Sequence, residues 1–249
     1  MQRRWRLVDS GLVQPPESAA LDEAILEAHS RDLVPPTLHF YVRATPTVSV
    51  GYFQRLEESI DLDECRKRGV AVIRRKSGGS TIYTDRGQLI YGLVTDTTCV
   101  GRDDSVFSAV CGAIAKAISS FGIEAHYRPP NDVEVGGMKV SGSAQLIRSG
   151  SVLQHGTVLV DTDLEAMDAV LKPTVHGDKL VRPSERVTTL AKVLGKTPNM
   201  DALKGAIARE IELRCDTKFG ASALSDFEAK IVLDLVVERY SRGDWNSKF

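Results

Sequence analysis

The sequence predicts an α+β domain built around a mixed, mostly antiparallel sheet that is flanked by helices. Apolar runs of strand length are interleaved with helical apolar stripes, but they show no regular βαβ alternation. Nothing repeats at a fixed period, and no tract is of low complexity. The 249 residues, 42% hydrophobic and 26% charged, are enough for one large domain, or for one domain with a small appendage.

Helical stripes and their capping residues give the expected helices. Ser18 is the expected N-cap of the first, which carries apolar residues over 20–28. The clearest helix starts at Asp104-Ser105, carries its stripe over 106–121 and ends at Gly122. Further helices are expected at 61–68, 164–171, 200–214 and 224–235.

Alternating and short apolar runs give the expected strands. They lie at residues 38–42, 47–54, 70–73, 89–94 and 151–161. Gly136-Gly137 signals a hairpin turn after 131–135, and residues 127–130 are expected to form an extended linker. Residues 174–189 are polar and basic and are expected to form a mobile loop.

Composition disfavours several function classes. The net charge of −1 gives no electrostatic reason to expect nucleic acid or a membrane as partner. The amino terminus lacks a signal-peptide apolar segment, and no run approaches the ~20 apolar residues that span a bilayer. Cys65, Cys99, Cys111 and Cys215 are too widely spaced for a zinc or redox motif. A cytoplasmic protein with free thiols is the simplest interpretation.

The segment 74–85, Arg-Arg-Lys-Ser-Gly-Gly-Ser-Thr-Ile-Tyr-Thr-Asp, is the first candidate site. It follows one predicted strand and precedes another, and it joins two arginines to paired glycines in a tight turn. Backbone N–H groups and fixed positive charge in one small volume suit an anionic or phosphate-bearing ligand. A plain β-turn with solvated arginines is the alternative.

A second constellation lies across the predicted hairpin. Asn131-Asp132 faces Lys139 and the small residues 141–143. The lysine ammonium can donate to a carboxylate, an acyl carbonyl or a phosphate, and the acidic residue can hold a metal ion. The alternative is an exposed lysine paired with Asp132. His155, in the middle of a strand, is either a core histidine or a ligand contact.

Together these segments resemble the lipoate–protein ligase family. Segment 74–85 is similar to its R-R-x-[ST]-G-G-G-A-V-x-H-D signature, and residues 131–133 with 138–145 resemble its N-D-[IV] and K-[IV]-S-G-S-A block. Residues 47–54, 155–161 and 186–188 resemble three further segments of the family, in the same order over about residues 7–190.

The resemblance implies the biotin/lipoyl ligase catalytic fold, related to class II aminoacyl-tRNA synthetases. It implies that lipoate and Mg-ATP give lipoyl-adenylate, and that the lipoyl group then passes to a lysine of an acceptor domain. Lys139 would be catalytic and Asp132 a Mg²⁺ ligand. The implied ATP and adenylate contacts are Arg75, Ser80, Thr81, Ile82, Tyr83 and Lys139. The implied lipoate contacts are Ser77, Gly78, Gly79, Lys139, Ser141, Gly142 and His155.

The chain departs from the family pattern at two positions, because Ser80 replaces the third glycine and Thr84 the histidine. Related octanoyl- and lipoyl-transferases carry a cysteine just before the segment equivalent to Asn131-Asp132, and this chain has none there. An ATP-dependent ligase is therefore favoured. A transferase acting without ATP and a non-catalytic lipoyl- or adenylate-binding protein are the alternatives.

Domain organisation and partners follow from the same resemblance. Residues 1–190 would form the catalytic domain, and 191–249 a short helical extension packed on it, in place of a large carboxy-terminal accessory domain. The implied partners are a lipoyl acceptor domain, of a dehydrogenase E2 subunit, a glycine cleavage H protein or a related lipoate-binding protein, and a separately encoded accessory subunit.

Overall fold

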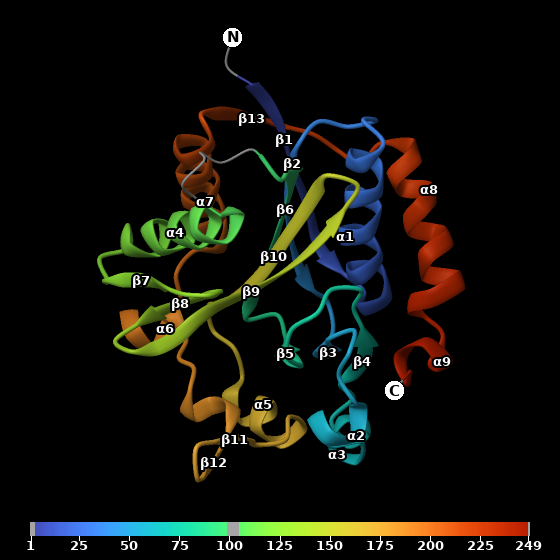
Figure 1. The fold of residues 1–249 in the computed structure, drawn as a ribbon. Helices are drawn as coiled ribbons and strands as arrows, with labels where there is room; N and C mark the ends of the chain where they lie inside the picture. Colours follow the sequence, from blue (N-terminus) through green and yellow to red (C-terminus); the bar gives the residue numbers. More distant parts are fainter. Residues whose placement is uncertain (1–2, 99–104, 249) are drawn as a thin grey trace.

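A computed structural model describes residues 3–98 and 105–248, and an eight-stranded sheet forms their centre (Figure 1). In their spatial order, the strands of this main sheet are β13 (Thr217–Ala221), β1 (Arg3–Val13), β2 (Thr37–Arg43), β6 (Gln88–Asp96), β10 (Ser151–Leu159), β9 (Met138–Arg148), β8 (Asp132–Val135) and β7 (Ala125–Arg128). The β13–β1 and β1–β2 pairs are parallel, and the other pairs are antiparallel. The predicted mixed, mostly antiparallel sheet is confirmed.

A second, three-stranded sheet lies beside the lower end of the main sheet in Figure 1. Its order is β4 (Ala71–Arg74), β3 (Thr47–Val50) and β5 (Ile82–Thr84), with β3 parallel to β4 and antiparallel to β5. A hairpin of β11 (Thr174–His176) and β12 (Lys179–Val181) lies apart from both sheets.

Helices cover both faces of the main sheet (Figure 1). The helical segments are α1 (Pro15–Ser30), α2 (Leu56–Ser59), α3 (Leu62–Lys67), α4 (Val106–Ser119), α5 (Leu164–Val170), η1 (Pro183–Glu185), α6 (Leu190–Leu194), α7 (Met200–Cys215), α8 (Asp226–Leu235), η2 (Val236–Tyr240) and α9 (Gly243–Asn246). None of these described helices is long and apolar enough to cross a membrane.

Side chains along β6 point alternately to the two faces of the sheet, so β6 contributes to the core on both faces. Leu89, Tyr91 and Leu93 pack with the apolar stripe of α4 and with α7, whereas Ile90 packs with α1 on the opposite face. Successive strand side chains point to opposite faces, so one apolar strand supports two helical layers. β6 is therefore buried on both sides, and β10 pairs with it along its whole length.

Several local predictions are confirmed. Ser105 caps α4 through a capping box with Ser108, while Asp104 lies outside the described residues. Asp61 caps α3, and Gly69 ends it with a φ of 64°. Gly136 and Gly137, with φ of 58° and 77°, form the turn between β8 and β9.

Other local predictions are wrong, for identifiable reasons. Ser18 lies inside α1 and donates to Pro15 O, because the helix already begins at the proline, whose missing N–H costs nothing there. The strand expected over 47–54 ends at Val50, and Gly51 starts a turn. Of the linker expected over 127–130, residues 127 and 128 belong to strand β7, which pairs with β8, and residues 129 and 130 lie in the turn that follows.

Residues 174–189 also differ from the expected mobile loop. They form the β11–β12 hairpin and η1, and two backbone hydrogen bonds join them to β9. Lys139 N donates to Arg186 O at 3.0 Å, and Thr188 N donates to Lys139 O at 2.9 Å. Polar composition alone had suggested mobility, but backbone pairing to β9 fixes the second half of this segment.

The segment after residue 190 is closely integrated with the rest of the fold. It supplies the edge strand β13, and α7 residues Leu203, Ile207 and Ile211 share a core with Trp5 and α4. Near its end, Trp245 Nε1 donates to Arg74 O at 2.8 Å, and Arg74 N donates to Asn246 Oδ1 at 2.9 Å. The division at residue 190 stays a prediction.

Candidate active site

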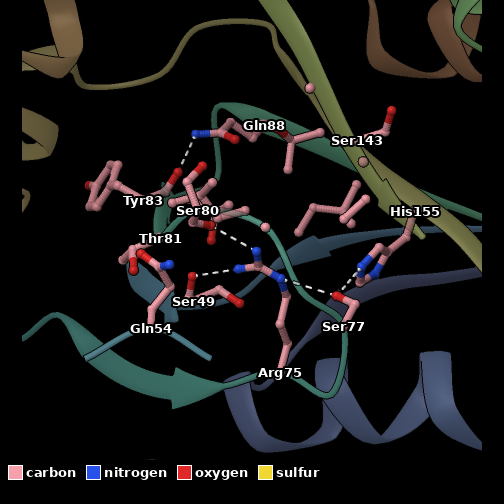
Figure 2. A pocket seen from close by; sticks show the side chains of 18 of the residues that line it. Ser49, Gln54, Arg75, Ser77, Ser80, Thr81, Tyr83, Gln88, Ser143 and His155 are labelled. Carbon is pink, nitrogen blue, oxygen red and sulfur yellow. Dashed lines mark hydrogen bonds between the residues drawn. The ribbon is translucent and has the colours of Figure 1, made fainter. Parts of the chain in front are cut away.

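A cavity of about 440 Å³ lies where the two sheets and α1 meet (Figure 2). Its walls come from the loop after β4, from β5, from β9 and β10 of the main sheet, and from α1 and α5. The two candidate segments of the sequence, 74–85 and 131–145, therefore meet in one cavity.

Ten of the predicted site residues line this cavity: Arg75, Ser77, Gly79, Ser80, Thr81, Ile82, Tyr83, Lys139, Gly142 and His155. Gly78, Ser141 and Asp132 are absent from the lining. Gly78 O accepts a hydrogen bond from Arg75, and the Asp132 carboxylate forms an ion pair with Lys139. Ser141 is buried on β9.

Arg75 holds the glycine loop in shape. Its guanidinium donates to Ser49 O at 2.8 Å and to Ser80 O at 2.7 Å (Figure 2). It also donates to Gly78 O at 2.7 Å. Burial, with a smaller effect from the charge of Arg43, lowers the pKa of Arg75 to about 10. The side chain stays charged at neutral pH, and its donors are directed to backbone carbonyls of the loop.

Two glycines allow this loop to lie against the turn after β3. A Cβ on Gly51 would lie 2.0 Å from Gly79 O, closer than any side chain can approach a backbone atom. Gly79 has a φ of 89°, in the left-handed region that favours glycine. The loop is therefore compact, and its carbonyls face Arg75.

Lys139 lies across the hairpin from Asp132, with its Nζ 2.7 Å from Oδ1. Gly142 makes this position possible, because a Cβ there would lie 2.3 Å from Nζ. The lysine is about one-third exposed and lines the cavity, whereas the carboxylate is more deeply covered. The pair presents one ammonium to whatever occupies the cavity.

The structure adds Asp22, which the sequence analysis missed. His155 Nδ1 lies 2.6 Å from Asp22 Oδ2, and His155 Nε2 lies 2.7 Å from Ser77 Oγ. Burial raises the pKa of Asp22, but the charge and hydrogen bonds of His155 and His39 outweigh it and hold that pKa well below its usual range. The sequence contains no motif that points to Asp22.

The two departures from the family pattern have local partners. Thr84 is fully buried, and its Oγ1 accepts from Arg43 at 2.7 Å. The neighbouring Asp85 accepts from Gly87 N and Asp163 N, each at 2.9 Å, so it shapes a turn. Ser80 is exposed at the cavity wall, and its carbonyl accepts from Arg75.

None of the cysteines within the described residues lines the cavity. Cys111, on α4, lies 3.3 Å from Ser143 Oγ and is 1% exposed. Burial raises its pKa, and burial likewise raises the pKa of Cys65 to about 11. Cys99 lies outside the described residues.

Comparison with known proteins agrees with the geometry. The lipoyl protein ligase A/B catalytic domain family matches residues 14–212. The chain belongs to this family. Among curated members, octanoyltransferase LipM of Symbiobacterium thermophilum is 31% identical over 274 aligned residues, which cover 100% of each chain. Octanoyltransferase LipM of Geobacillus kaustophilus is 28% identical and covers 98% of each chain.

Solved structures of the lipoyl ligase family share the fold. A bipartite lipoate protein ligase from Thermoplasma acidophilum superposes with a TM-score of 0.83 at 28% identity, covering 98% of this chain and 96% of that one. A lipoate-protein ligase A bound with ATP gives 0.83 at 27% identity, covering 99% of each chain. The chain is therefore an enzyme of the lipoyl ligase and transferase family.

Proposed function

We propose that the chain is a lipoate–protein ligase, which activates lipoate with ATP and transfers the lipoyl group to a lysine of an acceptor domain. The observation that carries this proposal is Lys139, presented to a cavity whose lining includes no cysteine of the described residues. An enzyme that forms an acyl-thioester intermediate needs a thiol as its nucleophile, and no described residue supplies one in the cavity. An ammonium, in contrast, suits the charge that develops when a carboxylate meets a phosphate.

In this proposal Lys139 donates both to the acyl carbonyl and to the α-phosphate, which orients the two groups and stabilises the transition state. Arg75 acts on the nucleotide side through the loop that it shapes, so that Ser80, Thr81, Ile82 and Tyr83 present their backbone to the ligand. Ser77, Gly78, Gly79, Ser141, Gly142 and His155 form the acyl side.

The proposal includes a magnesium ion that arrives with the nucleotide. No group of three or more histidine, cysteine, aspartate or glutamate side chains that could hold a metal occurs within 3–98 and 105–248. Asp132 is a single carboxylate, and Mg²⁺ is commonly held by one or two carboxylates together with substrate phosphates. When bound, the ion would neutralise phosphate charge, and Asp132, which pairs with Lys139, would be the protein carboxylate that holds it.

The test is to incubate the protein with Mg-ATP, lipoate and an isolated lipoyl acceptor domain, and to measure pyrophosphate release and acceptor mass. An ATP-dependent gain of one lipoyl group on the acceptor is expected. Lys139→Ala should abolish both signals, whereas Lys116→Ala, an exposed lysine on α4, should change neither. Full activity of Lys139→Ala would remove that lysine from the mechanism.

An octanoyltransferase is the second candidate, because the curated relatives that match the whole chain carry that name. Acceptor acylation from an octanoyl thioester without ATP would support it. Binding of lipoate or nucleotide with neither reaction would leave a non-catalytic binding protein. The accessory subunit is tested by adding a separately expressed partner, since a bipartite enzyme occurs among the structural neighbours.

A further inference from the structure

Four polar side chains form a continuous hydrogen-bonded chain into the cavity. It runs from Asp22 to His155, on to Ser77 Oγ, and from there to Arg75 Nε, which lies 3.1 Å from that oxygen. Figure 2 shows Ser77 and His155 pointing toward one another, with the Arg75 guanidinium to their left. The ligase reaction uses none of these contacts for proton transfer.

The donors and acceptors fix the direction of this chain. Asp22 accepts only, because its pKa lies far below neutrality, so His155 Nδ1 carries the proton and donates to it. His155 Nε2 is then an acceptor, and Ser77 Oγ donates to it. Arg75 can only donate, so its Nε–H points to the same serine oxygen.

This is the arrangement that activates a serine nucleophile: a hydroxyl on an imidazole, which a buried carboxylate orients. Arg75 adds a positive charge beside the serine oxygen, which favours its alkoxide form. The next two residues are Gly78 and Gly79, and no acceptor among the described residues takes a hydrogen bond from their backbone N–H groups. Those donors are available to an oxyanion next to the nucleophile.

The surroundings suit an acyl group. Ser77 is 2% exposed yet lines the cavity, together with apolar side chains of the main sheet, among them Ile90, Leu146 and Leu153. Covering the serine in this way limits the access of bulk water, which would hydrolyse an acyl ester. A free carboxylate has no leaving group for such an attack, whereas a thioester has one.

We propose that Ser77 accepts an acyl group from a medium-chain acyl thioester, a second activity that needs no ATP. His155 takes the proton from Ser77 Oγ as that oxygen bonds to the thioester carbonyl carbon. The C–S bond breaks, the thiolate leaves with the proton from His155, and an acyl-O-serine remains. An acceptor lysine amine then attacks this ester, which forms the amide and returns the proton to Ser77.

The experiment is intact-mass analysis of the whole protein after incubation with octanoyl coenzyme A, a soluble octanoyl thioester, without ATP. One octanoyl group should be gained, and peptide mapping should place it on Ser77. The adduct should resist neutral hydroxylamine, which cleaves thioesters but spares oxygen esters. Adding the acceptor domain should remove the group from the enzyme and place it on the acceptor lysine.

Substitutions separate this serine from the cysteines. Ser77→Ala should give no adduct, and Ser77→Cys should give one that neutral hydroxylamine now removes. Cys99→Ala and Cys111→Ala should keep the hydroxylamine-resistant adduct. An adduct that maps to either cysteine, or that persists in Ser77→Ala, would overturn the proposal.

The outcome is distinct from that of the ligase proposal. A protein that lipoylates its acceptor with ATP but gains no octanoyl group remains a ligase and refutes the Ser77 step. A protein that gains the group on Ser77 and shows no ATP-dependent lipoylation supports the Ser77 step and refutes the ligase.

Discussion

The Nζ of Lys139 lies 2.7 Å from Asp132 Oδ1, over a glycine whose added Cβ would come within 2.3 Å of that nitrogen. Gly142→Ala should therefore displace the lysine without unfolding the protein, because the end of a lysine side chain moves easily. A misplaced catalytic group can cost about 100-fold in rate, and we expect a loss of that order in acceptor lipoylation.

The matched control for Gly142→Ala is Gly205→Ala, on the exposed face of α7, where an added Cβ meets nothing within 4 Å. That variant should keep full activity and gain up to about 1 kcal/mol of stability, since alanine is the better helix former. Equal rates for the two variants would contradict a role for the position of Lys139.

Gly51→Ala should damage the glycine loop from outside the cavity. Its Cβ would lie 2.0 Å from Gly79 O, so either the turn after β3 or the loop must move. Strain of this kind typically costs about 1–3 kcal/mol of stability. We expect a lower unfolding temperature and weaker lipoate binding by calorimetry, while Gly112→Ala, with no neighbour within 4 Å, changes neither for the worse.

Thr84→Val should destabilise the protein, because it removes the oxygen that accepts from Arg43 at 2.7 Å. Both side chains are buried, and a buried charged donor left without its acceptor costs about 1–3 kcal/mol. Thr84→Ser keeps the hydroxyl and should retain most of the stability in urea denaturation. A valine variant as stable as the serine variant would show that Arg43 finds another partner.

Glu228 should make stability depend on acid pH. It is fully buried and accepts from both terminal nitrogens of Arg6, at 3.0 and 2.6 Å. Burial raises its pKa, but the hydrogen bonds from Arg6 and Ser225 outweigh this and lower it from 4.5. The carboxylate thus stabilises the fold above about pH 4.5, and that stability is lost as the pH falls through the lower folded-state pKa.

Glu228→Gln measures this contribution. At pH 7 the variant should lose about 3 kcal/mol of unfolding free energy, because Arg6 stays charged without its partner. Below pH 4.5 the difference from the natural chain should shrink, because the protonated glutamic acid then resembles the amide. A difference that stays constant from pH 7 to pH 3 would contradict the pairing.

Local signals predicted the parts of this fold that local physics determines. The capping serine at 105 and the glycine pair at 136–137 each fix a helix start or a turn within a few residues. β13 was missed, because it is a strand by virtue of its pairing with β1, a parallel partner more than two hundred residues away. Residues 174–189 were misjudged because composition says nothing about pairing with β9.

The candidate site shows the same division. The family motifs predicted the residues of two segments, and the structure brings most of them into one cavity. No motif pointed to Asp22, because a helical stripe looks apolar whether or not one member is a carboxylate. The place of Asp22 in the site is evident only from its contact with His155, which lies 133 residues further along the chain.

The contacts of Trp245 and Asn246 with the backbone of Arg74 have a practical consequence for protein engineering. α9 occupies the free edge of β4 one residue before Arg75, much as another strand would. A purification tag or reporter fused directly after α9 would disturb these contacts, and with them the loop that shapes the cavity. A fusion placed ahead of β1 acts on an element that does not line the cavity, and is the better choice for activity assays and immobilisation.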